Sequence, residues 1–580
     1  MISNGRGGAM LRLAVLLSPA ALLAVLGWTH RWNADDAFIN FRVVDQLVHG
    51  NGPVFNLGER VEAYTSPLWL ILLAVPSAIV GANHVEWIAV GLGLASSVAG
   101  LAAATYAAAL LNGGGAGVML PLGALTFAVL PPAWDFATSG LETGLGFAWL
   151  GLCFLGLVLM HSRERWREAR LRDLEPLDGV ALLAGLGPLV RPDFAVFSAG
   201  FLVLVVAVSP RPALHGALRA LAFALLLPLG YELFRMGYFA ELVPNTALAK
   251  EAGLSRWGPG LDYLWDSAGT YALYLPVTAL LGWLAVRARG DLLAAGRVTA
   301  LLHIAPPVMG LVYLLYIARV GGDFMHGRFV LPGLFAVLMP VAAIPVRRGL
   351  VEVVLGVGVV AWAIVCGVTL RTSYRDTVYP ISRGGINDER RIYVLGSHAA
   401  HPVTLGDYHR HPWAFVGKAM RYAAGGHPHV VTFVGPGVGR PFPDLPVRAD
   451  VPVSLVAPAV NVGLFGYGAG RDVWVVDMRG LGDPIAARIK LGRRRTPGHE
   501  KLLHTDWVVA RFTDGPPPGP GVADARRALH CGDLRRTLEA ITRPMSLGRF
   551  LDNVTFAPRA TTLRVPRDPV PAYRRLCRSQ

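Results

Sequence analysis

Long apolar runs, separated by short polar loops, dominate the first 370 residues of the chain. Most of these runs are about 18 to 20 residues long, and a helix of that length crosses a hydrocarbon core roughly 30 Å thick. The pattern therefore predicts a polytopic α-helical membrane protein. We expect the apolar segments near residues 11–28, 66–81, 86–110, 115–131, 141–160, 179–209 (two segments), 217–236, 271–288, 300–318, 329–346 and 350–370.

Basic residues indicate which loops lie in the cytoplasm, because short loops rich in Lys and Arg stay on that side of a membrane. Twelve full spans would leave the C-terminus inside, whereas the basic loops require it outside. We therefore expect about eleven spans, with one segment in 66–160 or the broken run 179–209 re-entrant or merged. The basic loops are 161–175, 210–219, 286–299 and 346–349, and the outward parts are 29–65, 237–270, 319–328 and all residues after 370.

Composition supports this interpretation. Hydrophobic residues make up 53% of the 580 residues and charged residues only 16%, against about 25% charged in soluble domains. The mean hydropathy is +0.45. A net charge of +15 would suit a nucleic-acid-binding protein, but the basic residues cluster between apolar runs. The charge thus reports membrane topology, and we expect no nucleic-acid partner.

The composition changes after residue 370, where Pro, Gly and charged residues become frequent. Short β-rich runs at 429–434 and 473–476 alternate with candidate helices at 523–529 and 534–541. We predict two domains, a transmembrane catalytic domain of residues 1–370 and an extracytoplasmic α/β domain of residues 371–580.

Two of the four cysteines, Cys531 and Cys577, fall in this second domain. Disulfides persist in extracytoplasmic compartments, so a bond between these two residues is plausible. Cys153 and Cys366 lie within apolar runs and are expected to be small core residues. No cysteine spacing resembles a zinc site, and the sequence leaves any metal unknown.

An acidic pair, Asp35 and Asp36, follows the first apolar run and begins an amphipathic segment. Phe38, Phe41 and Val44 recur at helical spacing along it. Such a helix is suited to lie in the membrane interface. Asp is also a good N-cap residue, and capping explains one of the two readily. Adjacent carboxylates repel, however, so one of them would have a raised pKa and could act as a base near neutrality.

Further polar residues lie in or beside the apolar runs. Intramembrane charges are costly and by default mark function or a buried pair, and Arg191 with Asp193 fits either explanation. The loop at 319–328 carries Arg and His beside a span, which suits a phosphate held at the membrane surface, or lipid phosphates in general. Our candidates for donor phosphate binding are Arg42, Lys250, His326 and Arg328, and those for substrate binding are Glu142, Arg191, Asn245 and Asp323.

The order of several motifs resembles a known superfamily. The runs "ADDAFINFRVVDQLVHGNGPVFNLGERVEAYTSPLW", "TSGLETGL", "LVRPD", "VPNTALAK" and "GGDFMHGRFVLPGLF" are similar, in this order, to bacterial GT-C glycosyltransferases. Within the superfamily, "NGPVFNLGERVEA", "RGLGDPIAARI" and "TPGHEKLL" resemble the mycobacterial terminal arabinofuranosyltransferases, which add β-(1→2)-linked arabinofuranose to cell-wall arabinan. The likeness runs from about residue 28 to the C-terminus.

This resemblance implies a GT-C fold with an extracytoplasmic cap and decaprenyl-phosphoryl-arabinofuranose as the donor. It also implies that the Asp35/Asp36 pair holds the catalytic carboxylate, which activates the acceptor hydroxyl for an inverting displacement. The acceptor would be arabinan of arabinogalactan or lipoarabinomannan at the plasma membrane. Some GT-C enzymes use a divalent cation, and the sequence does not decide whether this chain does.

Three alternatives stay open at this point. Another GT-C enzyme would transfer mannose or a different sugar from a polyprenyl phosphate. A transporter of lipid-linked glycans would often show inverted repeats, and none is evident in the sequence. A membrane-anchored binding protein would hold polysaccharide through its C-terminal domain without turnover.

Overall fold

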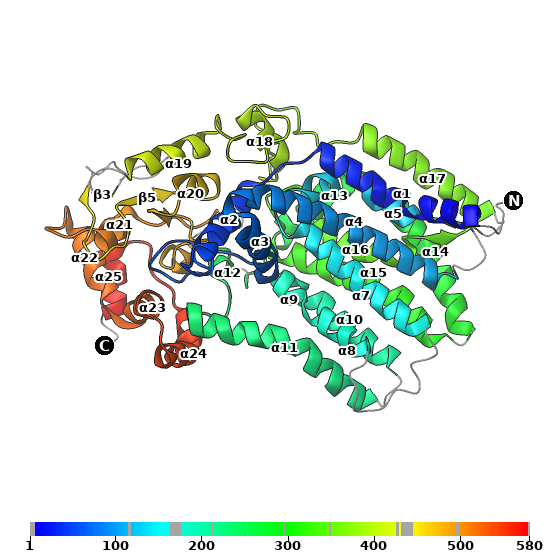
Figure 1. The fold of residues 1–580 in the computed structure, drawn as a ribbon, viewed down its shortest axis with the longest axis horizontal. Helices are drawn as coiled ribbons and strands as arrows, with labels where there is room; N and C mark the ends of the chain where they lie inside the picture. Colours follow the sequence, from blue (N-terminus) through cyan, green and yellow to red (C-terminus); the bar gives the residue numbers. More distant parts are fainter. Residues whose placement is uncertain are drawn as a thin grey trace. The chain divides into compact units, whose positions relative to one another are not determined.

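The computed structural model describes residues 6–113, 118–162, 176–209, 213–251, 253–294, 296–346, 350–424, 429–430, 445–492 and 499–577. The chain forms two compact units, each built from separate segments (Figure 1). The first contains Met1–Trp32, Ala89–Pro228 and Ser255–Ile392, and the second contains Asn33–Ile88, Leu229–Leu254 and Tyr393–Gln580. The two units are described separately below.

The first unit is a helical bundle in which α7, α10, α15 and α16 run side by side (Figure 1). Glycines let two of its helices approach closely, since a Cβ on Gly100 of α4 would clash with the backbone carbonyl of Phe147 on α7. Small residues serve this purpose in membrane helix packing. The helices are α1 (Arg6–Thr29), α4 (Val85–Leu111), α5 (Leu122–Ala128), α6 (Pro131–Ala137), α7 (Thr143–Ser162), α8 (Pro176–Gly185), α9 (Gly187–Val190), η3 (Pro192–Phe194), α10 (Ala195–Val208), α11 (Ala213–Phe239), α13 (Trp257–Thr270), α14 (Tyr274–Leu293), α15 (Arg297–Val320), α16 (Val330–Leu338), η4 (Met339–Val341) and α17 (Leu350–Val368), with β1 (Met119–Leu120) paired antiparallel to β2 (Ile344–Pro345). The first residues of α4, up to Ile88, and the last of α11, from Leu229, belong to the second unit.

Six helices within the described residues are long and apolar enough to cross a membrane, or seven if one bent pair counts as a span. That pair is α13 and α14, which meet at an angle of 90°. Four shorter apolar helices, of 10 to 17 residues, accompany them. The protein is therefore a polytopic membrane protein, but the full-length spans are fewer than the expected eleven.

The difference arises where apolar runs contain helix breakers. The run 179–209 is divided at Arg191, whose extended backbone precedes Pro192. The run 115–131 gives a short strand and the seven-residue α5 rather than a span. Most of the basic residues used for topology, at 163–175, 210–212 and 347–349, lie outside the described residues.

The second unit combines short helices with a four-stranded sheet of order β4-β3-β5-β6. Strands β5 and β6 are parallel, with Leu455 opposite Val473, and every residue of both is buried. Buried parallel strands are largely apolar, as these are except for Asp477 at the end of β6. The elements are α2 (Asp35–Val48), α3 (Pro67–Val80), η1 (Ala82–His84), α12 (Asn245–Ala249), α18 (Glu389–Ser397), α19 (Pro412–Ala423), β3 (His429–Val430), β4 (Leu445–Pro446), β5 (Leu455–Ala459), α20 (Leu464–Ala469), β6 (Val473–Asp477), η5 (Ala486–Arg488), α21 (Thr505–Phe512), α22 (Pro520–Leu529), α23 (Gly532–Thr542), α24 (Leu547–Thr562) and α25 (Pro569–Cys577).

The core of this unit lies around Trp474, Trp507 and Phe512. The buried faces of α21 and α22 contribute to this core. Cys531, which precedes α23, and Cys577, at the end of α25, form a disulfide with Cα atoms 5.1 Å apart. Cys153 and Cys366 are free and buried.

The compact units do not follow the linear division at residue 370. Residues 33–88 and 229–254 pack with the chain from residue 393 onward, so the second unit includes the segment that carries the acidic pair. Helix α2 also differs from the expected interfacial helix. Both of its faces are largely buried, including Arg42 and Gln46 on the polar side, because α3 and α20 pack against it.

Candidate active site

Asp35 is the first residue of α2, and its carboxylate does not cap that helix. The N-cap position is Ala34, which makes no side-chain capping bond. Instead, Asp35 Oδ1 accepts a hydrogen bond of 2.8 Å from the backbone N–H of Leu464, the first residue of α20. Capping of α2 therefore does not explain this acidic residue.

The environment of Asp35 tunes its proton affinity. Its side chain is 6% exposed, and burial raises the pKa of its carboxyl to about 7. This value already includes the negative charge of Asp36, which also raises the pKa, and hydrogen bonds from the backbone N–H groups of Leu464 and Gly463, which lower it. Asp36 itself is half-buried. A carboxylate with a pKa near 7, one oxygen held in place and a like charge beside it is suited to act as a general base.

Arg42 has a different role from the one expected. Its guanidinium is 1% exposed and donates to four backbone carbonyls and one side-chain amide, so all of its donor groups are engaged. Burial lowers its pKa to about 10. Arg42 thus fastens α2 within the second unit and has no donor left for a phosphate. Its acceptors are the carbonyl oxygens of Phe55, Gly466, Gly470 and Val473, and Oδ1 of Asn56.

The segment around α12 is held by two side chains. Asn245 donates from its amide to the carbonyl oxygens of Gly480 and Leu481, at 2.8 and 3.1 Å. Lys501, which the sequence did not single out, is buried and pairs with Glu251 at 2.8 Å. Lys250, by contrast, is half-buried, and no ion pair of its ammonium is found within the described residues. Asn245 is a positioning residue here, while Lys250 can still meet an anion.

In the first unit, Glu142 accepts from two arginines. Arg191 Nη1 lies 2.5 Å and Arg328 Nη2 3.3 Å from Glu142 Oε1. Arg191 also pairs with Asp193 at 3.0 Å, which fits the explanation that these two neutralise each other. Asp323 Oδ2 lies 3.9 Å from Arg328 Nη1. The structure thus joins four of the expected substrate and phosphate residues in one buried network.

His326 lies in a second cluster of this unit. Its Nδ1 is 2.5 Å from Asp266 Oδ2, and its Nε2 is 2.8 Å from the hydroxyl of Tyr271. Tyr374 donates its hydroxyl to the same Asp266 oxygen at 3.0 Å. Sequence reasoning missed these three partners. The only signal was a single acidic residue, Asp266, in the otherwise uncharged second half of α13.

No group of three or more His, Cys, Asp or Glu side chains suited to hold a metal ion occurs in the described ranges. The arrangement therefore offers a positioned carboxylate in the second unit and, in the first, two arginines and a histidine whose orientation is set by acidic neighbours.

These features define a polytopic membrane protein. Its first unit buries cationic side chains, and its second unit carries a carboxylate, Asp35, whose pKa is raised. Comparisons with known proteins specify the family. A model of the AftB family C-terminal domain matches residues 448–575. The terminal β-(1→2)-arabinofuranosyltransferase of Mycobacterium tuberculosis is 35% identical over 97% of this chain and 97% of its own length. That of Corynebacterium glutamicum is 32% identical over 96% of this chain and 87% of its own.

The chain therefore belongs to the family of terminal β-(1→2)-arabinofuranosyltransferases, and the resemblance noted in its sequence is confirmed. Among solved structures, ArnT from Cupriavidus metallidurans bound to undecaprenyl phosphate aligns with 96% of this chain and 90% of that chain. The sequence identity is 15% and the TM-score 0.43. At that score the likeness carries no inference of its own.

Proposed function

We propose that this protein is a terminal β-(1→2)-arabinofuranosyltransferase that takes arabinofuranose from a polyprenyl-phosphate donor, decaprenyl-phosphoryl-arabinofuranose. The acceptor is the non-reducing end of cell-wall arabinan. The observation that carries the proposal is the 35% identity to the mycobacterial enzyme over 97% of both chains. Similarity of that extent includes the segment of the acidic pair as well as the C-terminal domain.

The base in this reaction is Asp35. Its carboxylate takes the proton of the acceptor hydroxyl as the hydroxyl oxygen bonds to the anomeric carbon of the donor. The bond between that carbon and the phosphate oxygen breaks, and polyprenyl phosphate leaves with the electron pair. A pKa of about 7 supports this role, because an efficient base titrates near the working pH. Asp36 acts mainly through its charge, which helps to raise the pKa of Asp35.

The donor phosphate is bound by Arg328 in the first unit. His326 has both ring nitrogens engaged by Asp266 and Tyr271, so its role there, like that of Lys250 in the second unit, stays a prediction. Cationic donors aimed at the oxygen that gains charge lower the barrier of such a transfer. Glu142 and Asp323 set the position of Arg328, and Arg191 shares Glu142 with it. Arg42 and Asn245 are not in this set, since both are occupied by backbone carbonyls. Arg328 and His326 are thus both held in position by acidic neighbours.

The carboxylate pair and the C-terminal residues from 371 face the outside of the plasma membrane. The disulfide between Cys531 and Cys577 supports this orientation, because disulfides persist in oxidising compartments. The C-terminal residues bind the arabinan acceptor.

Transfer from radiolabelled decaprenyl-phosphoryl-arabinofuranose to a short arabinan, with linkage analysis of the product, tests the proposal. A new terminal β-(1→2)-arabinofuranose is the expected product. Transfer of mannose or another sugar instead, from its own polyprenyl phosphate, would assign a different activity. Single displacement inverts the anomeric carbon, so a donor and product of equal configuration would refute the in-line displacement with Asp35 as the base.

A further inference from the structure

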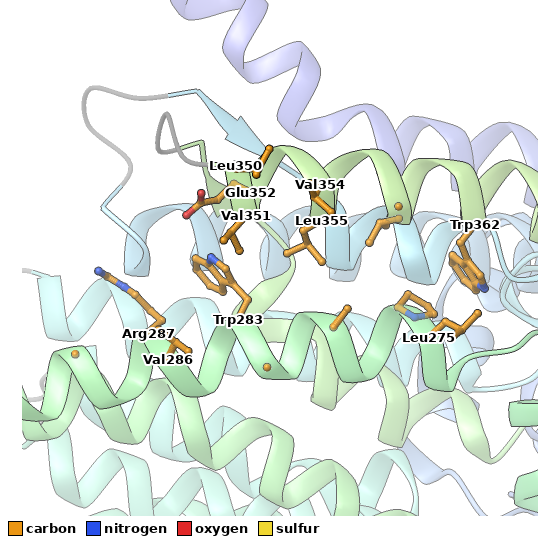
Figure 2. A pocket seen from close by; sticks show the side chains of 16 residues that line it. Leu275, Trp283, Val286, Arg287, Leu350, Val351, Glu352, Val354, Leu355 and Trp362 are labelled. Carbon is orange, nitrogen blue, oxygen red and sulfur yellow. The ribbon is translucent and has the colours of Figure 1, made fainter.

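Most of the exposed large apolar side chains in the described residues lie on helices that are long enough to cross a membrane. Val286 of α14 and Val351 of α17 are examples (Figure 2), and membrane lipid covers side chains of this kind. Helix α24 of the second unit is not one of these spans. Its residues Leu547 and Leu551 are nevertheless 76% and 55% exposed. Their exposure needs an explanation other than a membrane span.

The exposed apolar residues of α24 form one stripe along the helix. Leu547 and Leu551 are four positions apart, and Val554 and Pro558 follow after three and four more. Residues at this spacing share one face of a helix. Pro558 is also exposed, and Val554 is half-buried. The apolar stripe of these four residues therefore remains largely uncovered over a helix length of roughly 16 Å, at 1.5 Å per residue.

Helix α24 is fixed to the C-terminal end of α11, whose residues from Leu229 onward belong to the same unit (Figure 1). Asn553 donates from its side-chain amide to the carbonyl oxygen of Gly237 at 2.9 Å. The ring of Phe550 lies directly against the same glycine, because a Cβ at that position would overlap the ring. Since α11 is long and apolar enough to cross a membrane, α24 lies at one end of a span.

The contact is on the lipid-facing side of α11. Leu233 lies one turn before Gly237 on the same face and is 53% exposed. A Cβ on Gly230, which is also on this face, would meet no atom within 4 Å. Leu233 is the last exposed large apolar residue of α11, so the boundary of the hydrocarbon core lies near it. Helix α24 meets α11 four residues further on, or roughly 6 Å along the helix axis, which is the depth of the head groups.

The charges of α24 complement an anionic lipid surface. Arg549 and Arg559 lie outside the apolar stripe, and Asp552 is the one acidic residue of the helix. Arg543, just before the helix, pairs with Glu539 at 3.0 Å. No ion pair of Arg549 or Arg559 is found in the part of the chain that the structure describes. An apolar stripe combined with arginines on the polar face is typical of helices that lie on anionic membranes.

We infer that α24 lies in the lipid–water interface beside α11 and binds a phospholipid leaflet with anionic head groups. The apolar stripe contacts the upper part of the acyl chains, and Arg549 and Arg559 are available to lipid phosphates. The second unit is thereby held to the membrane near the C-terminus of the chain as well as through α11. This contact does not depend on which sugar the protein transfers.

Fluorescence quenching of the full-length protein in lipid nanodiscs tests the inference. Leu551→Cys is labelled with bimane, and the disc contains a lipid with a nitroxide near its head group. We expect this probe to be quenched at least about twofold more than the same probe in Asp552→Cys. Asp552 is the matched control, because it is exposed on the same helix but lies outside the stripe. The unsubstituted protein gives the background, since its free cysteines, Cys153 and Cys366, are buried.

The lipid composition of the disc tests the role of charge. Quenching of the probe at position 551 should be at least about 1.5-fold greater with phosphatidylglycerol than with phosphatidylcholine. The paired change Arg549→Gln and Arg559→Gln should remove this difference. Equal quenching of the unchanged arginine protein in both lipids would overturn the preference for anionic head groups.

Equal lipid quenching at positions 551 and 552 would overturn the inference, because the stripe would then have no preference for lipid. A probe at position 551 that is shielded from both the nitroxide and aqueous iodide would overturn it as well. In that case a protein, such as a second copy of this chain, would cover the stripe. Arabinose transfer is not measured in these assays, so failure of the proposed function would leave their outcome unchanged.

Discussion

Replacing Asp36 by Asn should move the pH dependence of transfer to lower pH. Asp35 must be deprotonated to accept a proton, so kcat/KM of the wild type should rise with pH through the Asp35 pKa of about 7. The Asp36 charge is one of the causes that raise this pKa. Asn has nearly the same shape and no charge, so the substitution removes the like-charge repulsion and leaves the burial of Asp35 in place.

The size of the expected pH shift follows from the relative importance of the causes that raise the Asp35 pKa. Burial is the largest contribution to the rise of the Asp35 pKa from 3.8, and the charge of Asp36 is a smaller one. Two unit charges about 4 Å apart interact by about 1 kcal/mol in water and by about 4 kcal/mol near a protein surface. Because the charge of Asp36 ranks below burial and the Leu464 hydrogen bond, we use the lower figure, which corresponds to roughly 0.7 pH unit. The acid limb of the variant should therefore lie roughly half to one pH unit below that of the wild type, and still well above pH 4.

The assay is transfer from the polyprenyl-phosphate donor between about pH 5 and 9, with each enzyme normalised to its own maximum. Normalisation separates the shift from any loss of rate. Asp35→Asn serves as the paired variant, because its amide oxygen can still accept from Leu464 N–H but cannot act as a base. An unmoved or upward-shifted limb in Asp36→Asn would refute the coupling, and full activity of Asp35→Asn would refute its role as the base.

Three further outcomes follow from the contacts. Asp35→Asn should lower kcat/KM by roughly 10²- to 10⁴-fold, the usual contribution of a general base, with an unfolding temperature close to that of the wild type. Glu142→Gln should lower the free energy of unfolding by roughly 1.5 to 3 kcal/mol, because Arg191 and Arg328 lose their shared carboxylate but keep Asp193 and Asp323 as partners; unfolding in detergent measures this, and an unchanged midpoint would contradict it. The paired change Cys531→Ser and Cys577→Ser should destabilise the second unit by about 2 to 4 kcal/mol, whereas Cys153→Ser breaks no disulfide and is the control for loss of a thiol.

The sequence by itself determined the features that depend on local patterns. Apolar runs of sufficient length gave the membrane-spanning helices, and the helical spacing of Phe38, Phe41 and Val44 indicated α2, which ends at Val48 before Gly50. The candidate helices at 523–529 and 534–541 correspond to α22 and α23. Such elements are encoded in consecutive residues, because period and helix-ending residues act over a few positions.

Only the tertiary structure decided what those elements contact. Arg42 resembles a surface cation in the sequence, but its acceptors include Gly466 and Val473, which are 424 and 431 positions away. The pairs of His326 with Asp266 and of Lys501 with Glu251 also join distant segments. The free-energy cost of burying a charged side chain is offset only where an oppositely charged or hydrogen-bonding group lies beside it in the folded protein. Hydropathy and spacing along the chain carry no information on where that partner is.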